Sequence, residues 1–216
     1  MGNRFVNRWR EKEKQPSLAS KIKNVGKPSE NLKGQINFVI QRLDTQTNSL
    51  DSAVKRFQIR DAEIFNRVVT TMAEHDEARA NILATELSEI RKVEKMLTHA
   101  SLALQSVSMR LNTVSEMGDL LTVLAPAKNV LNSIRSEMCG VLPEASQELG
   151  NIGNLLGDIV VSTNQGSDVP VNVGKASTEA EEILREASLA AEMKLSQQLP
   201  DVAFEKLSKE RESIET

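Results

Sequence analysis

The apolar side chains between residues 30 and 60 follow a seven-residue repeat. After Pro28 and Ser29 they fall at Leu32, Ile36, Val39, Leu43, Leu50, Val54 and Phe57. Gln46 and Thr47 stand where one apolar member is missing. Steps that alternate between three and four residues place side chains along one narrow helix face, so this pattern predicts a helix with a coiled-coil seam.

A second, longer helix is predicted after a turn. The repeat changes phase between Phe57 and Asp61, and Asp is a frequent helix cap, so we expect the chain to turn back there. The second helix then runs from about Asp61 to Met117, with its main stripe at Leu83, Leu87, Ile90, Val93, Leu97, Ala100, Leu104, Val107, Leu111 and Val114. At 1.5 Å per residue its length is about 85 Å, roughly twice that of the first helix.

The far half of this stripe has no partner within such a hairpin. An exposed apolar face on a long helix favours association with other chains. The pattern therefore predicts self-assembly through the far half of the second helix and the start of the next one. The residues expected to carry it are Leu97, Leu104, Val107, Leu111 and Leu121.

Shorter helices are expected after Gly118. One amphipathic stretch runs from Leu120 to Ile134 with a kink at Pro126, and another from Glu144 to Val161. The second contains three glycines, at 150, 153 and 157, which share one face if the stretch is helical. Because glycine costs a helix about 1 kcal/mol, we favour a hinge there over close helix packing.

Composition divides the chain into four segments. Residues 1–28 form a basic amphipathic segment, and residues 29–161 form a helical core with the hairpin at about 29–117 and shorter helices at 118–161. Residues 162–177 read as a flexible linker. Residues 178–216 form an acidic helix and tail, opened by a capping box at Thr178 to Glu181. Its apolar face, including Ile183, Ala187 and Leu195, is expected to fold back onto the hairpin and inhibit assembly.

The first segment has the pattern of a membrane-surface helix. Phe5 and Trp9 are four residues apart and are surrounded by cations, which suits the headgroup region of an anionic membrane. The expected membrane-binding residues are Arg4, Phe5, Arg8, Trp9, Arg10, Lys12, Lys14, Lys21, Lys23 and Lys27. A basic tail without fixed structure, or one that binds DNA through its charge, remains an alternative.

Composition supports an all-α fold. Neither glycine nor proline occurs between Gly34 and Gly118, although these residues commonly mark turns. Only 3% of the residues are aromatic, which favours narrow helix–helix seams over a thick core. We therefore predict an elongated, all-α protein with a long helical hairpin followed by shorter helices.

Charge is distributed unevenly along the chain. The first 60 residues carry a net charge of +8 and the remaining residues −11, which gives the overall −3. A basic front and an acidic back attract an anionic partner or each other, within one chain or between chains.

The sequence offers little for catalysis or metal binding. The two histidines, His75 and His99, are far apart, and the single cysteine excludes an intrachain disulfide. No phosphate-binding glycine loop or paired metal-ligand motif occurs, so we predict a non-enzyme without metal or cofactor. No apolar run is long enough to span a bilayer, so we expect a cytoplasmic protein that is peripheral on the inner face of the membrane.

The order of these parts resembles the ESCRT-III family. Two stretches, Ala53 to Asp61 and His75 to Ala80, are similar to its archaeal cell-division members, the CdvB group, as is the region from Glu86 to Arg110. The resemblance covers approximately residues 30–195. It implies filaments that assemble on and constrict membranes at the division site, with copies of itself and paralogous chains as partners.

The resemblance also implies remodelling by an AAA-type ATPase that reads the C-terminal tail. Leu199, Pro200 and Val202 are similar to the first half of a proline-rich docking motif, but the later prolines are missing. Two other functions stay open: a closed coiled-coil scaffold dimer that does not polymerise, and a basic-tailed protein that associates with DNA.

Overall fold

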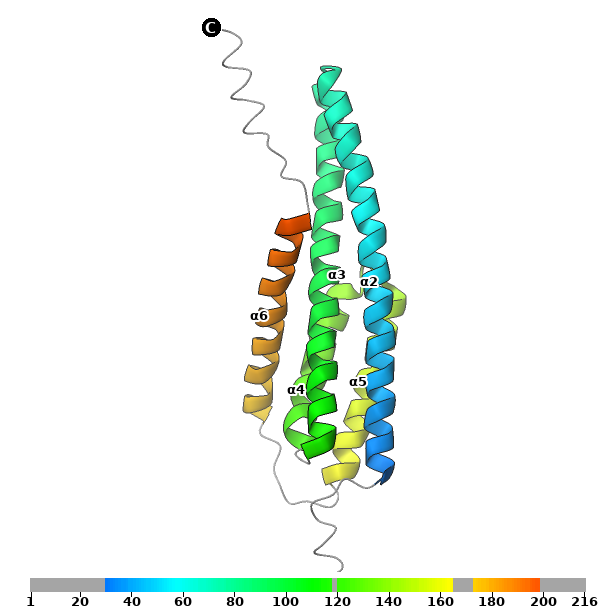
Figure 1. Ribbon diagram of the computed structural model, residues 1–216, viewed down its shortest axis with the longest axis vertical. Helices are drawn as coiled ribbons and strands as arrows, with labels where there is room; N and C mark the ends of the chain where they lie inside the picture. Colours follow the sequence, from blue (N-terminus) through cyan, green and yellow to red (C-terminus); the bar gives the residue numbers. More distant parts are fainter. Residues whose placement is uncertain (1–29, 118–119, 165–172, 199–216) are drawn as a thin grey trace, which may run out of the picture.

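A computed structural model describes residues 30–117, 120–164 and 173–198, and the account below concerns these residues. They form an elongated all-α structure without strands, as the sequence predicts (Figure 1). The helices are α2 (Glu30–Ala73), α3 (Glu77–Met117), α4 (Leu120–Met138), α5 (Pro143–Asn164) and α6 (Val173–Gln198).

The hairpin of α2 and α3 has two arms of nearly equal length, 44 and 41 residues. The prediction of a turn at Phe57 to Asp61 is therefore wrong, because α2 continues through it to Ala73. The turn lies at residues 74–76, where His75 adopts a φ of 59°. The Asp76 carboxylate accepts a hydrogen bond from the Arg79 amide at 3.0 Å, which caps the first turn of α3.

Polar pairs fix the register of the two arms. The Ser108 hydroxyl donates to Asp44 at 2.7 Å, and the Ser101 hydroxyl donates to Asp51 at 2.6 Å. In each pair the two residue numbers add up to 152, as expected for antiparallel helices in one fixed register. The two pairs are seven residues apart along each helix. They border a seam in which Gln46 and Thr47 are also buried, so the missing apolar member is filled by polar side chains.

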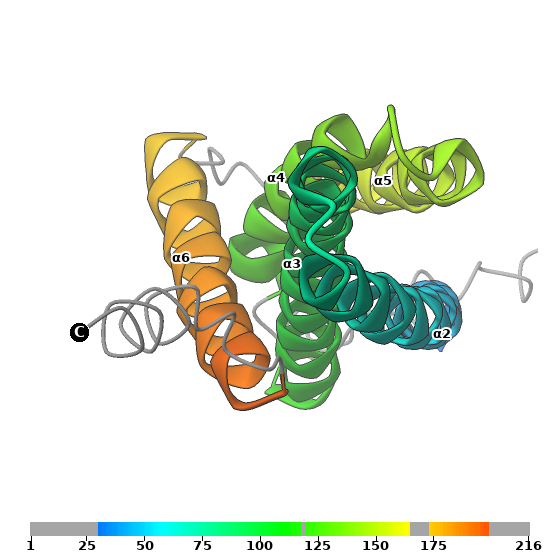
Figure 2. The same ribbon diagram turned by 90° about the horizontal axis from the view of Figure 1, so that it is seen from above.

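The remaining helices surround only one end of the hairpin. Viewed along the hairpin, α2 and α6 lie on opposite sides of α3, while α4 and α5 cover another face (Figure 2). The Arg42 guanidinium donates to the Glu148 carboxylate at 2.8 Å and so ties α5 to α2. Pro126 lies within α4.

The hinge expected at the three glycines is wrong, because α5 is one helix from Pro143 to Asn164. The glycines face α4 instead. A Cβ atom on Gly150 would lie 3.1 Å from the Arg135 guanidinium, and one on Gly157 would lie 3.1 Å from the Lys128 ammonium group. Tight packing against α4 thus explains glycines that lower the intrinsic stability of the helix.

The predicted linker 162–177 is wrong at both edges. Helix α5 continues to Asn164, and α6 begins at Val173 rather than at the capping box of Thr178. The connection between the two helices is therefore shorter than expected. The described part of α6 ends at Gln198.

Candidate assembly surface and the helix that covers it

The apolar stripe expected to drive assembly is buried within the chain. Leu97, Leu104 and Leu111 have no exposed surface, and Val107 is 1% exposed. The expectation that this stripe is uncovered is therefore wrong for this conformation. Because the arms are nearly equal in length, α2 pairs along α3, and α4 and α6 cover further faces of α3. Leu121 lies in α4, but its side chain is outside the described part.

The C-terminal helix packs along α3, as predicted, and also along α4, which the sequence did not predict. Ile183, Ala187 and Leu195 are 1%, 5% and 7% exposed. Ala180 and Ala191 lie on the same buried face, and their small side chains let α6 approach the hairpin closely. Ile183 shares a small pocket with Val107, Val123 and Ala127, where α3, α4 and α6 meet. A side chain from the expected inhibitory helix thus lines the same pocket as one from the expected assembly stripe.

Polar contacts join the same surfaces. The Lys95 ammonium group donates a hydrogen bond to the Glu192 carboxylate at 2.6 Å. The Arg110 guanidinium lies 3.8 Å from the Glu186 carboxylate. The hydrogen bond and the charge of Lys95 lower the pKa of Glu192. Because these groups are exposed to solvent, the pairs orient α6 more than they stabilise it.

His99 connects three helices. Its Nε2 atom lies 3.1 Å from the Leu184 carbonyl oxygen of α6, and its Nδ1 atom lies 3.5 Å from the Glu137 carboxylate of α4. The sequence singled out His99 only as a metal-ligand candidate. Its contact with a backbone carbonyl depends on the register of α6, for which the sequence holds no local signal.

The apolar contacts therefore carry most of the attachment of α6. Full burial of an Ile or Leu side chain contributes about 1.5–3 kcal/mol, and a buried alanine contributes less. Two large buried side chains, the partly buried Leu184 and four alanines form a modest interface for a helix of 26 residues. An interface of this size is compatible with release of α6 from the hairpin while α2 and α3 stay folded.

Several predicted sites lie outside the described residues. These are all of the membrane-binding residues from Arg4 to Lys27 and the ATPase-docking residues Leu199, Pro200 and Val202. Among the described residues, no three His, Cys, Asp or Glu side chains are grouped to hold a metal ion. None of the described helices is both long and apolar enough to cross a membrane.

Two known proteins are similar to this chain in amino-acid sequence. Cell division protein B1 of Sulfolobus acidocaldarius is 36% identical over 189 residues, which cover 88% of this chain and 88% of that protein. The chain belongs to the CdvB group of the ESCRT-III family. Cell division protein B of the same organism is 32% identical over 167 residues, which cover 77% of this chain and 64% of that protein.

The remaining comparisons give no further relatives. No protein-family model matches this chain, and no solved structure matches it. The two relatives support a role of this CdvB-type chain in cell division. Their names state no catalytic activity, and the absence of an enzymatic function stays a prediction from the sequence.

The hairpin of this ESCRT-III chain also contains a buried polar layer. The Arg91 guanidinium donates to the Asp61 carboxylate at 2.7 Å, and Asp61 is 2% exposed. Glu94, one turn along α3, is fully buried, and neither of its carboxylate oxygens has hydrogen-bonding geometry with a described residue. Burial and, to a smaller extent, Asp61 raise the pKa of Glu94, while Gln58 and Arg91 partly oppose this.

Proposed function

We propose that this chain is a filament-forming, membrane-remodelling protein that acts in cell division or vesicle release. The observation that carries the proposal is the position of α6 over the α3 stripe. Ile183 and Val107 line one pocket, so a helix on a short tether occupies an apolar surface of the kind that joins chains into filaments. The described conformation then corresponds to an inactive, closed monomer.

Release of α6 is the proposed activating step. The helix lowers the fraction of molecules competent for assembly, and the apparent assembly concentration rises by the inverse of that fraction. An anionic membrane surface binds the basic segment 1–28 on the inner face of the cell membrane, at the division site. The proposed partners are further copies of this chain, paralogous ESCRT-III-like chains and an AAA-type ATPase.

The test compares one substitution at two positions on α6. Ala187 is buried against the hairpin, whereas Ala190 on the same helix is exposed. Ala187→Asp places a charge in an apolar interface and should displace α6, because an unpaired buried charge is costly. We expect A187D to form filaments on anionic vesicles, seen by negative staining, at a lower protein concentration than the parent chain. A190D should behave as the parent.

Limited proteolysis verifies that α6 has been released in A187D. If α6 is released and assembly needs the same protein concentration as before, the inhibitory role of α6 is wrong. If neither the parent chain nor A187D forms filaments, and ultracentrifugation shows a discrete dimer, the function is that of a scaffold dimer and the proposed function is wrong. Sedimentation with duplex DNA instead of vesicles would favour the DNA-associated alternative.

A further inference from the structure

His99 is held where three helices meet, and each of its ring nitrogens faces an oxygen atom. Its side chain belongs to α3 and is 15% exposed. The Nε2 atom lies 3.1 Å from the Leu184 carbonyl oxygen of α6, and the Nδ1 atom lies 3.5 Å from the Glu137 carboxylate of α4. Helices α3, α4 and α6 all pack against one another. His99 therefore contacts both the helix that covers the assembly stripe and the neighbouring part of the bundle.

A neutral imidazole cannot satisfy both contacts. It carries a proton on one ring nitrogen and a lone pair on the other, whereas a carbonyl oxygen and a carboxylate only accept hydrogen bonds. Whichever nitrogen carries the proton, the other directs its lone pair at an oxygen atom. The charged imidazolium has an N–H group on both nitrogens and can donate to Leu184 and Glu137 at once. At 3.5 Å the contact with Glu137 is long for a hydrogen bond, but opposite charges still attract at this distance.

The other charged side chains near His99 are exposed and of mixed sign. Those on α3, α6 and α4 are, in this order, Lys95, the three residues Glu181, Arg185 and Glu192, and Arg135. Lys95 and Glu192 pair with each other at 2.6 Å, and Arg135 lies beside Gly150 of α5. Because solvent and salt screen exposed charges, the Glu137 carboxylate is the charge that acts most directly on the imidazole.

We propose that His99 makes the attachment of α6 depend on pH. The docked helix favours the imidazolium, because only this form donates to both oxygen atoms. By linkage the imidazolium favours the docked helix by the same factor. Imidazole side chains change charge between about pH 5 and pH 8, so α6 is held most firmly at the acid end of this range and less firmly as the pH rises. That a rise in pH then favours assembly rests on the proposed function; the pH dependence of the attachment does not.

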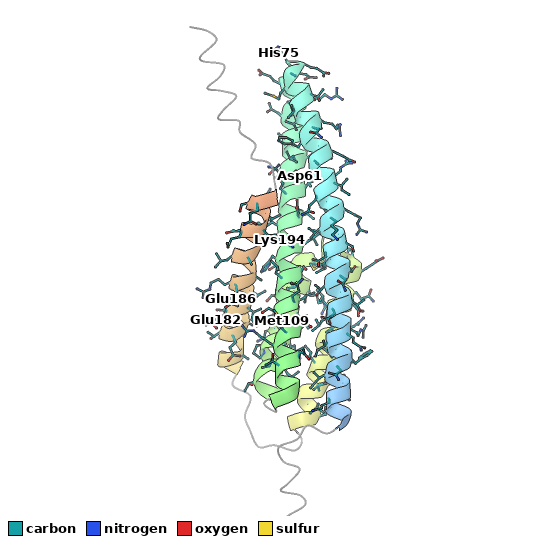
Figure 3. All side chains as sticks on the ribbon, viewed as in Figure 1. Asp61, His75, Met109, Glu182, Glu186 and Lys194 are labelled. Carbon is teal, nitrogen blue, oxygen red and sulfur yellow. The ribbon has the colours of Figure 1, made fainter. Side chains whose placement is uncertain are left out.

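The other histidine of the chain does not share this environment. His75 is exposed at the turn between α2 and α3, at the far end of the hairpin (Figure 3). Imidazole is the side chain that ordinarily changes charge in this pH range. A pH-dependent attachment of α6 that disappears when His99 is replaced therefore identifies a single residue.

Hydrogen exchange of the α6 amides in the full-length chain measures the attachment. Protection is expressed relative to an unstructured chain at the same pH, which removes the intrinsic pH dependence of exchange. In the parent, the protection of α6 should fall about five-fold from pH 6 to pH 8. This is the low end of the coupling found between linked sites, because Glu137 is 45% exposed and solvent weakens its attraction.

Two variants separate His99 from other titrating groups such as Glu94. His99→Gln removes the titrating ring but keeps an N–H donor for the Leu184 carbonyl, so the five-fold fall should be lost. Glu137→Gln offers an amide N–H to the Nδ1 lone pair of the neutral ring, so both forms of His99 are satisfied. E137Q should therefore protect α6 more than the parent does at pH 8 and should lose the pH dependence. In the H99Q background this gain at pH 8 should disappear.

Glu182→Gln is the matched control, because it removes the same charge from an exposed position on α6 (Figure 3). E182Q should behave as the parent at both pH values. Equal protection of α6 at pH 6 and pH 8 in the parent overturns the proposal, and so does a fall that persists in H99Q. An E137Q chain that keeps the pH dependence of the parent also overturns it, because Glu137 is then not the acceptor that disfavours the neutral ring.

Assembly at the two pH values separates this inference from the proposed function. On anionic vesicles the parent should form filaments at a lower protein concentration at pH 8 than at pH 6, and H99Q should lose this difference. If the protection of α6 depends on pH as expected but assembly does not, the inhibitory role of α6 is wrong and the coupling through His99 stands. If neither depends on pH, while A187D still assembles at lower concentration than A190D, the coupling is wrong and the proposed function stands.

Discussion

The two ends of the hairpin are built differently. The base, residues 30–56 of α2 and 92–117 of α3, is surrounded by α4, α5 and α6 and shares one large apolar core with them. The tip, residues 57–73 and 77–91, has only its own two helices. Its core is the small cluster of Ile64, Val68, Leu83, Leu87 and Ile90.

The buried polar layer lies at the boundary between base and tip. Asp61 is located just beyond the end of α6, between the covered region and the turn at His75 (Figure 3). Asp61, Arg91 and Glu94 thus interrupt the apolar seam where the surrounding helices stop. A polar layer that contributes little apolar burial separates two cores, so the tip can open while the base stays folded.

The largest expected effect comes from truncating one leucine in each region. Leu104 in the base is fully buried, and Leu87 in the tip is 4% exposed. Leu104→Ala should lower the free energy of unfolding by about 4 kcal/mol and Leu87→Ala by about 2 kcal/mol, because the surroundings of a two-helix tip collapse more easily around a cavity. Denaturant unfolding followed by circular dichroism measures both.

Hydrogen exchange provides the control for this pair. In L87A only the amides of the tip should exchange faster, whereas in L104A the exchange of the whole bundle should increase. Equal losses of stability, with exchange raised everywhere in both variants, would show that base and tip unfold as one unit.

A smaller effect is expected from the polar layer, through Glu94. Its raised pKa means that the folded chain binds this proton more tightly than the unfolded chain. The contribution of Glu94 to stability is then highest at pH values below its unfolded pKa of about 4.3, decreases as pH rises through the folded pKa, and stays lower above it. Glu94→Gln should remove this loss and stabilise the protein at pH 8 by on the order of 1 kcal/mol.

The measurement is the unfolding midpoint of the parent and E94Q at pH 4 and pH 8. The two chains should differ at pH 8 and converge at pH 4. E192Q is the control, because Lys95 lowers the pKa of Glu192, so its replacement should cost stability at pH 8 rather than add to it. A parent chain whose stability rises from pH 4 to pH 8 relative to E94Q would contradict the raised pKa of this buried carboxyl.

Local pattern was sufficient to predict the helices but not the turn. The repeat from Ile36 to Val54 marks one helix face, and the structure buries that face. The phase change at Asp61 looked like a cap in sequence, yet it marks the buried polar layer, because Asp61 finds its partner Arg91 thirty residues away. The actual cap, Asp76, stands in a stretch that the sequence pattern assigned to the interior of the second helix.

The candidate site was also only partly predictable, because its contacts join residues that are far apart in the sequence. The spacing of Ile183, Ala187 and Leu195 showed which face of the C-terminal helix is buried. It did not show that α4 also covers Val107 and its neighbours, because an apolar stripe has the same sequence whether its partner lies in the same chain or in another. The contact of His99 with the Leu184 carbonyl also depends on how two distant helices align.

The smallest expected effect concerns the turn at the tip. His75 has a φ of 59°, a left-handed conformation that costs non-glycine residues of order 1 kcal/mol or more. His75→Gly relieves this strain but adds conformational freedom to the unfolded chain, so the net gain should be about 0.5 kcal/mol. If the tip opens on its own, amide exchange should slow in residues 57–91 and stay the same in the base. Slower exchange along the whole of α2 and α3 would instead mean that the polar layer transmits stability, and that the hairpin is a single cooperative unit.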